Sequence, residues 1–119
     1  MQRSELPYLR HMVDAVERLQ SHLEGVDRTD FDSDLIRQDA VVRQLEILGE
    51  AAGRVSRSLA AASSEIPWAK ITGMRHKLIH DYFFVDWDVV WITATVEVPE
   101  LLPKLRALIV RLEEATDSE

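Results

Sequence analysis

The sequence predicts an all-α fold, an up-and-down bundle of four to five antiparallel helices, and three observations support this prediction. Apolar side chains recur at helical spacing through most of the chain. The interruptions between these segments are short and rich in Gly, Pro, Asp and Ser. The chain has 119 residues, of which 46% are hydrophobic, which is enough for one core but not for two. We therefore expect a single helical domain over residues 1–119, with a frayed tail at 116–119.

Apolar stripes predict the first two helices. The first is expected at about residues 4–24, where the apolar positions are Leu9, Met12, Val13, Val16, Leu19 and Leu23. The segment "EGVDRTDFDSD" interrupts it with Gly25, and Ser33 or Asp34 is expected to cap the helix that follows. That second helix is expected at about residues 34–60, with its stripe at Val41, Leu45, Leu48, Ala52, Val55 and Leu59.

Shorter helices are predicted in the second half of the chain. "AASSEIP" ends the second helix, and Pro67 suits the first turn of a third helix at about residues 66–81. A fourth helix is expected to begin near Asp86, although the β-branched run of residues 92–98 has low helix propensity. Pro99 should kink or restart the chain before a last helix at about residues 99–115.

Composition excludes several classes of protein. No apolar run reaches the roughly 20 residues that cross a membrane, and "MQRSELPYLR" has no signal-peptide pattern. The chain has no cysteine, which excludes disulfides and thiolate metal sites. We therefore expect a cytoplasmic protein without a membrane partner. Proteins that bind long nucleic acids non-specifically are usually basic, whereas this chain has a net charge of −7. Any role with RNA must therefore depend on a local basic patch, such as one completed by oligomerisation.

The second helix carries two faces with alternative interpretations. A stripe of small side chains lets another helix come close, either inside the monomer or across a dimer seam: Gly49, Ala52, Gly53, Ser56 and Ala60. A polar row lies opposite, at Arg43, Glu46, Glu50, Arg54 and Arg57. This row is either a solvated face or a place where Arg54 and Arg57 flank an anionic ligand.

The third helix contains the densest chemistry, in "GMRHKLIHDYF" at residues 73–83. At about 100° per residue, one side of an ideal helix is apolar and is expected to face the core, with Ile71, Met74, Leu78 and Tyr82. A second side is polar and includes His76, Lys77 and His80, and Arg75 lies at the border of the apolar side. Arg75 and His80 are then about 140° apart and do not meet. They can cooperate only if the helix ends before His80 or if a second copy supplies the partner group. This spacing favours a site shared across a two-fold axis, with Gly73 allowing close approach.

Arginine and histidine together suit metal-free RNA cleavage. A guanidinium binds phosphate oxygens in a bidentate manner, and an imidazole transfers protons near neutral pH. The 2′-hydroxyl of RNA supplies the nucleophile, and Tyr82 can hydrogen-bond a phosphate or stack on a base. His76 and His80 also have the i,i+4 spacing of a metal-binding pair, but only Asp81 offers a third ligand, so we expect no metal. A polar helix face without any chemistry is the remaining alternative.

"RHKLIHDY" matches the R-x4-H-x-Y motif of HEPN-domain toxins of the HepT family, as found in HepT–MntA toxin–antitoxin systems. "LEILGEAAGRVS" (45–56) resembles the Gly-Glu-Ala-Ala segment of that family, and "IPWAKITGMRHKLIHDYFFVDWDVVW" (66–91) resembles its Trp, Gly-Met-Arg and His-x-Tyr landmarks. The resemblance covers residues 5–115. One departure is His76, at a position where the family often has Asn.

The resemblance implies a HEPN-like homodimer that acts as a metal-independent RNase toxin. It implies that Arg75 and His80 are the catalytic pair, and we assign RNA or phosphate binding to His76, Lys77, Tyr82, Arg54 and Arg57. It also implies a partner, an MntA-like minimal nucleotidyltransferase antitoxin that transfers AMP from ATP to Tyr82. ATP would be used by that partner, so no cofactor is expected on this chain. The alternative is a non-catalytic HEPN module that binds substrate or nucleotide for a partner nucleotidyltransferase.

Overall fold

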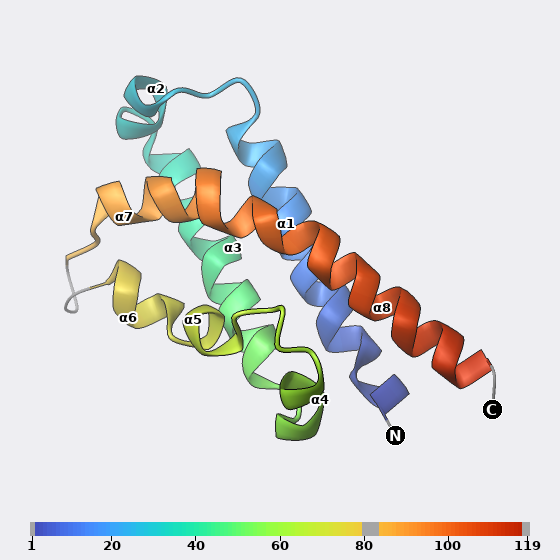
Figure 1. Cartoon of the computed structure of the whole chain (residues 1–119). Coiled ribbons are helices and arrows are strands. Elements are labelled where there is room, and N and C mark those ends of the chain that lie inside the picture. Colours follow the sequence, from blue (N-terminus) through green and yellow to red (C-terminus); the bar gives the residue numbers. More distant parts are fainter. Residues whose placement is uncertain (1, 80–83, 118–119) are drawn as a thin grey trace.

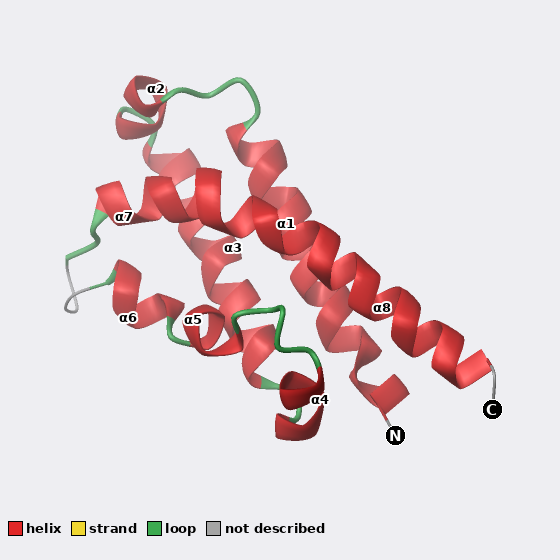
Figure 2. Cartoon of the chain, in the orientation of Figure 1, coloured by secondary structure: helices red, strands yellow, loops and turns green. Residues whose placement is uncertain are grey.

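The computed structural model describes residues 2–79 and 84–117, and helices make up most of this part of the chain (Figures 1 and 2). The α-helices are α1 (Leu6–Leu23), α2 (Arg28–Asp32), α3 (Leu35–Gly53), α4 (Arg57–Ala62), α5 (Trp68–Thr72), α6 (Met74–Leu78), α7 (Trp87–Ile92) and α8 (Leu101–Asp117). The shorter elements are η1 (Gln2–Glu5), the π-helical turn η2 (Thr93–Glu97) and the 3₁₀ turn η3 (Val98–Glu100). The all-α prediction is confirmed.

Three long helices form the centre of the fold. Helix α1 runs antiparallel to α3 and to α8, and it packs between them (Figure 1). The predicted stripes point inward, because α1 buries Leu9, Met12, Val16 and Leu19, and α3 buries Val41, Leu45 and Leu48. In the described part of the chain, no helix has both the length and the apolarity that a membrane span requires.

The second predicted helix is two helices in the structure, so its span of about 34–60 was wrong. Of the two predicted caps, Ser33 and Asp34, it is Asp34 that caps the start of α3. Its side chain accepts a hydrogen bond from the Arg37 backbone N–H at 3.0 Å. Helix α3 ends at Gly53, and Ser56 caps the new helix α4 through a 3.1 Å hydrogen bond from the Leu59 N–H. The Ser56 backbone N–H and hydroxyl also donate to the carboxylate of Glu5, which fixes this turn against the N-terminal segment.

The stripe of small residues serves packing inside the monomer at two of its positions, Gly49 and Ala52, and Ala52 is buried in the core. A Cβ at Gly49 would lie 3.1 Å from the carbonyl oxygen of Ile71, so Gly49 allows α5 to approach α3 closely. Gly53 is exposed, and a Cβ there would meet nothing within 4 Å. The close approach at Gly49 therefore supports packing inside the monomer, rather than a dimer seam, as the role of this residue.

The third predicted helix is also interrupted, and it ends earlier than expected. Gly73 separates α5 from α6, and its N–H donates to the Ala69 carbonyl at 3.0 Å. A Cβ at Gly73 would lie 3.1 Å from that same oxygen, which explains why glycine stands here. Helix α6 ends at Leu78 because Ile79 is extended (φ −120°, ψ 108°) and forms an isolated antiparallel bridge with Val85. The predicted continuation to residue 81 was wrong.

The last third of the chain is one bent helical arm (Figure 1). Helix α7 passes into η2, so the β-branched run of residues 92–98 is helical but includes a wider π-helical turn. Pro99 lies in the 3₁₀ turn η3, after which α8 begins at Leu101. The predicted restart at Pro99 is confirmed.

Candidate active site

Arg75, His76 and Lys77 of the motif lie on α6, which ends just before the connection to α7. The Ile79–Val85 bridge and a 2.8 Å hydrogen bond from the Asp86 N–H to the Leu78 carbonyl join the two ends of this connection. His80 and Tyr82 lie outside the described residues. Because α6 ends before His80, the first condition under which Arg75 and His80 of one chain can meet is fulfilled. The spacing of Arg75 and His80 therefore no longer requires a second copy of the chain, and the homodimer stays a prediction.

The described part of the motif divides into a core face and an exposed face. Met74 and Leu78 are buried, as predicted, at 6% and 1% exposure, whereas Arg75, His76 and Lys77 are exposed. Among the described residues, neither the Arg75 guanidinium nor the His76 imidazole has a hydrogen-bond or ion-pair partner. A guanidinium at this position is free to bind an anion from solution.

Lys77 differs from its two neighbours because it is already paired. Its Nζ lies 2.7 Å from the Glu97 carboxylate of η2, which joins α6 to the bent arm. This hydrogen bond holds the pKa of Glu97 below its usual range. Lys77 was predicted to bind RNA phosphate. To do so, its ammonium group must bind the phosphate and the Glu97 carboxylate at the same time, or leave Glu97.

Replacing Lys77 by Met should therefore destabilise the fold slightly, and only above the titration range of Glu97. A lowered folded pKa means that the pair stabilises the protein above about pH 4.5, the ordinary pKa of Glu, and that this contribution is lost as pH falls through the folded pKa. Both side chains are about half exposed, so we expect a cost below about 1 kcal/mol at pH 7. Urea unfolding of wild type and variant at pH 7 and pH 3 measures this, and an equal difference at both pH values would contradict it.

Arg54 and Arg57 lie at the turn between α3 and α4, and both are exposed. Arg54 lines a hollow of about 260 Å³ together with Tyr8, His11 and Glu50. No α6 residue lines this hollow, so the structure does not join Arg54 to the motif through it. The predicted role of Arg54 and Arg57 in binding an anionic ligand stays a prediction.

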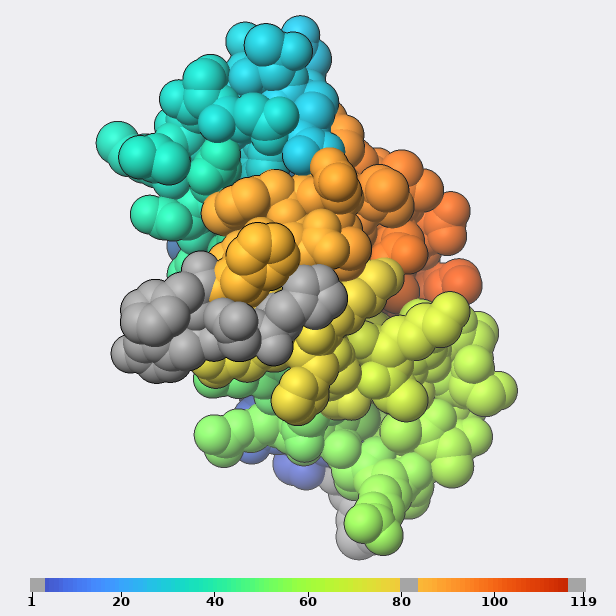
Figure 3. All heavy atoms as spheres, turned by 90° about the vertical axis from the view of Figure 1, so that its left-hand side faces the viewer, coloured from blue at the N-terminus to red at the C-terminus, as the bar shows by residue number. Residues whose placement is uncertain are grey.

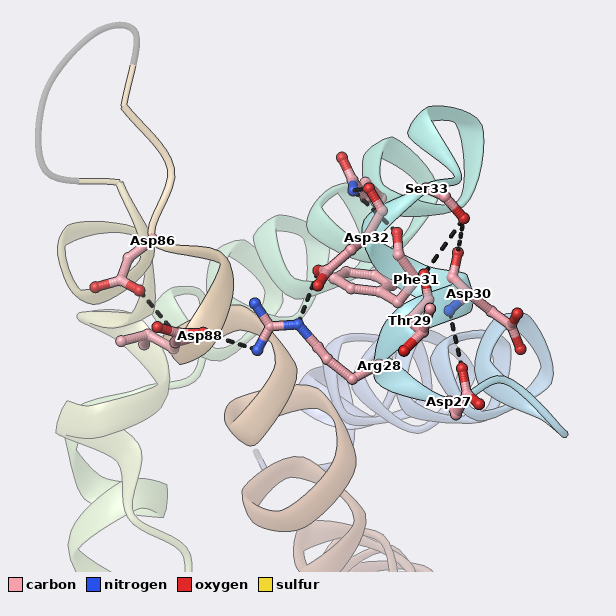
Figure 4. A network of polar contacts seen from close by, with 11 residues as sticks. Asp27, Arg28, Thr29, Asp30, Phe31, Asp32, Ser33, Asp86 and Asp88 are labelled. Carbon is pink, nitrogen blue, oxygen red and sulfur yellow. Dashed lines mark hydrogen bonds and ion pairs between the residues drawn. The ribbon is translucent and has the colours of Figure 1, made fainter.

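Helix α2, which the sequence did not predict, fixes the start of α7 (Figure 4). Arg28 lies between two carboxylates, with its Nε 2.8 Å from Asp32 on the same helix and its Nη1 2.8 Å from Asp88 on α7. These contacts raise the pKa of Arg28, chiefly through the hydrogen bond to Asp32. The available sequence signals were the i,i+4 spacing of Arg28 and Asp32 and the cap Asp27, which accepts a 2.8 Å hydrogen bond from the Asp30 N–H.

Phe31 forms the apolar part of the same junction. It is fully buried, and its ring centroid lies 5.9 Å from that of Trp87 and 5.2 Å from that of Trp91. On the face shown in Figure 3, α2, α7 and α6 follow one another from top to bottom. The connection that carries His80 and Tyr82 is therefore attached at one end to α6, and at the other end to a helix that α2 fixes.

In the part of the chain that the structure describes, no group of three or more His, Asp or Glu side chains is arranged to hold a metal ion. Helix α6 ends at Leu78, so the helical i,i+4 geometry considered for His76 and His80 does not continue through residue 80.

The helical fold is consistent with the HEPN-like class that the R-x4-H-x-Y motif indicates, and Arg75 of this motif is exposed and has no partner among the described residues. Comparison with known proteins specifies the family. Residues 12–108 match the family described as "Ribonuclease HepT-like", and the chain belongs to this family. The chain is 38% identical over 103 residues to a protein of Caldanaerobacter subterraneus subsp. tengcongensis named "Putative RNase TTE0752", covering 87% of this chain and 92% of the relative.

Two further relatives match the chain over a similar share of its length. The chain is 38% identical over 108 residues to the "Probable ribonuclease HepT" of Thermococcus cleftensis, covering 91% of this chain and 98% of the relative. It is 33% identical over 107 residues to the "Putative RNase MJ0125" of Methanocaldococcus jannaschii, covering 90% and 92%. No solved structure is significantly similar to the chain.

Proposed function

We propose that this chain is a metal-independent endoribonuclease and the toxin of a toxin–antitoxin pair. The observation that carries the proposal is Arg75, an exposed guanidinium without a partner among the described residues, on a helix that ends just before His80. Membership of the HepT-like ribonuclease family and the ribonuclease names of the relatives support the same activity.

The cleavage needs only groups of the motif and the substrate. His80 takes the proton of a ribose 2′-hydroxyl, and the 2′-oxygen attacks the adjacent phosphorus. The bond from phosphorus to the 5′-oxygen of the next nucleotide breaks, and an imidazolium returns a proton to that oxygen. Arg75 stabilises the extra negative charge on the phosphoryl oxygens in the transition state. The products are a 2′,3′-cyclic phosphate and a 5′-hydroxyl.

RNA binding by an acidic protein requires cations that its own carboxylates do not neutralise. Seven cationic side chains are held in ion pairs: Arg10, Arg18, Arg28, Arg37, Lys77, Arg106 and Arg111. In the described part of the chain, the cations without an ion pair are Arg43, Arg54, Arg57, Lys70, Arg75 and Lys104. Arg43 lies on α3, Arg54 directly follows α3, and Arg57 begins α4. Lys70 lies on α5, Arg75 on α6 and Lys104 on α8, and of these helices α3 and α5 pack against α6. This arrangement supports RNA as the substrate despite the net charge of −7.

We further propose that the protein acts as a homodimer and that an MntA-like nucleotidyltransferase antitoxin silences it. The Tyr82 hydroxyl would attack the α-phosphorus of ATP on that partner, forming a phosphodiester with AMP and releasing pyrophosphate. The added AMP places a bulky anion where an RNA phosphate must bind, and it offers Arg75 a competing phosphate. The Tyr of the R-x4-H-x-Y motif supports this assignment.

The proposal is tested by cleavage in the presence of a chelator. Purified protein should cut a single-stranded RNA in EDTA and leave 2′,3′-cyclic phosphate ends, whereas His80→Ala should not. A 2′-O-methyl RNA of the same sequence should stay intact, because it lacks the nucleophile. Cells expressing the wild-type chain alone should grow more slowly than cells expressing His80→Ala. Intact RNA together with equal growth would overturn the nuclease, and RNA binding without cleavage would favour a non-catalytic HEPN module.

A further inference from the structure

A groove of about 520 Å³ runs beside the motif helix. Residues of α5 and α6 form one wall, and residues of η2, η3 and the start of α8 form the other. Gly73, Met74 and Lys77 bring the motif helix itself into the wall. The groove is thus a neighbour of the proposed active site and not part of it, since Arg75 does not line it.

All lysines of this chain lie in this groove. The sequence contains three of them, Lys70 on α5, Lys77 on α6 and Lys104 on α8, and each one lines the groove. The eleven arginines are spread over the rest of the chain, and none of those whose side chains the structure describes lines the groove. An ammonium group is a compact point charge that binds phosphate without the strict geometry of a guanidinium.

The floor of the groove is apolar. Ile71, Met74, Val98 and Leu101 line it and are at most 6% exposed, so they belong to the core. A flat ring can lie against such a floor while its charged substituent reaches the lysines at the rim. The groove therefore fits a ligand with an apolar face and an anionic end, which describes a nucleotide.

Two carboxylates modify the charge of the groove. Glu97 is occupied by Lys77 at 2.7 Å, so this pair adds little net charge. Glu100 also lines the groove and adds a negative charge to it. Lys70 and Lys104 form no ion pair with a described residue. A carboxylate accepts hydrogen bonds from base N–H groups or a ribose hydroxyl, so Glu100 suits a nucleotide better than inorganic phosphate.

The geometry of α6 connects the groove to the site of cleavage. At about 100° per residue, Arg75 and Lys77 lie about 200° apart, on opposite flanks of the helix, with His76 at the outermost position between them. A strand whose scissile phosphate binds Arg75 can pass over His76 and enter the groove on the far flank.

We infer that the lysine groove is a subsite for one nucleotide of single-stranded RNA next to the cleaved phosphate. The base or ribose lies on the apolar floor, and Lys70 and Lys104 bind the phosphate from opposite walls. The inference rests on the proposed ribonuclease function, since it describes how the same substrate continues beyond the active site.

Binding measurements with an RNA that cannot be cut test the groove separately from catalysis. A 2′-O-methyl oligonucleotide is titrated with wild type, with the double variant Lys70→Gln/Lys104→Gln and with the control Arg10→Gln/Arg106→Gln. The control removes the same net charge from exposed, ion-paired positions outside the groove. We expect the lysine variant to lower the slope of log K against log salt by about 0.7 for each lost phosphate contact, and to weaken binding by roughly tenfold at 0.1 M salt. The arginine control should behave like wild type.

Acetylation of amines gives a direct readout, because the chain has only three lysines. Bound RNA should lower the acetylation of Lys70 and Lys104 several-fold, as measured by mass spectrometry of digested protein. If wild type cuts RNA but the lysine variant binds like the arginine control and acetylation is unchanged, the subsite is wrong and the nuclease stands. If RNA protects both lysines but is never cut, the subsite stands and the nuclease fails. Absence of any RNA binding would overturn the subsite.

Discussion

Arg75→Ala should lower the rate of RNA cleavage by roughly 10²–10³-fold, because it removes a donor to the phosphoryl oxygens at the transition state. The side chain is exposed and has no partner among the described residues, so its loss removes no packing and no ion pair there. The thermal midpoint of unfolding should therefore stay within about 2 °C of wild type. The measurement is kcat/KM on a fluorogenic RNA, together with a thermal melt.

Two further variants make this result specific. Arg75→Lys keeps the charge but loses the planar fork, so its kcat should lie between those of wild type and Arg75→Ala. Arg18→Ala removes an exposed arginine that is paired only with Asp14 at 3.0 Å on α1, and it should cleave at the wild-type rate. If Arg75→Ala cleaves as fast as Arg18→Ala, Arg75 does not act on the phosphate.

Phe31→Ala should lower the free energy of unfolding by about 3–5 kcal/mol, the usual cost of truncating a buried aromatic side chain. Phe31 has no exposed surface and contacts the rings of Trp87 and Trp91, which are among the three tryptophans of the chain. Its loss leaves a cavity between α2 and α7 and weakens the support of the connection that carries His80. Cleavage should therefore fall as well, in protein that is still folded.

Urea unfolding followed by tryptophan fluorescence measures the loss of stability. Phe31→Leu fills most of the space and should cost much less than Phe31→Ala. Ile36→Ala is the matched control, since Ile36 is 84% exposed at the start of α3 and its truncation should cost less than about 0.5 kcal/mol. A cost for Phe31→Ala no larger than that for Ile36→Ala would show that α2 does not hold α7 in place.

Hydrophobic periodicity was sufficient for the long helices and insufficient for their ends. The stripes of α1 and α3 lie where they were predicted, because burial of one face is what makes these segments helical. The break after Gly53 depends on Glu5, which lies far away in the sequence and binds Ser56. The end of α6 likewise depends on the bridge between Ile79 and Val85, which no helical pattern contains.

The candidate site was predictable in its residue types but not in its surroundings. His76 is exposed as the spacing within one helix predicts, whereas that spacing puts Arg75 at the border of the core face and the structure shows it exposed. The pair between Lys77 and Glu97 joins residues twenty positions apart, and Glu97 lies in the π-helical turn η2, which helical periodicity does not predict. Helix α2 was missed because five residues with one buried aromatic side chain are too short to show a helical period.

The confinement of every lysine to one groove has a practical consequence for work with this protein. Apart from the α-amino group, any reagent directed at amines attaches to this groove, so sensor surfaces coupled through amines would hold the molecule by the face proposed to bind RNA. The chain has no cysteine, so a single cysteine introduced at an exposed position of α8, such as Val110, gives a unique thiol for immobilisation. Attachment through that thiol leaves all three ammonium groups unmodified.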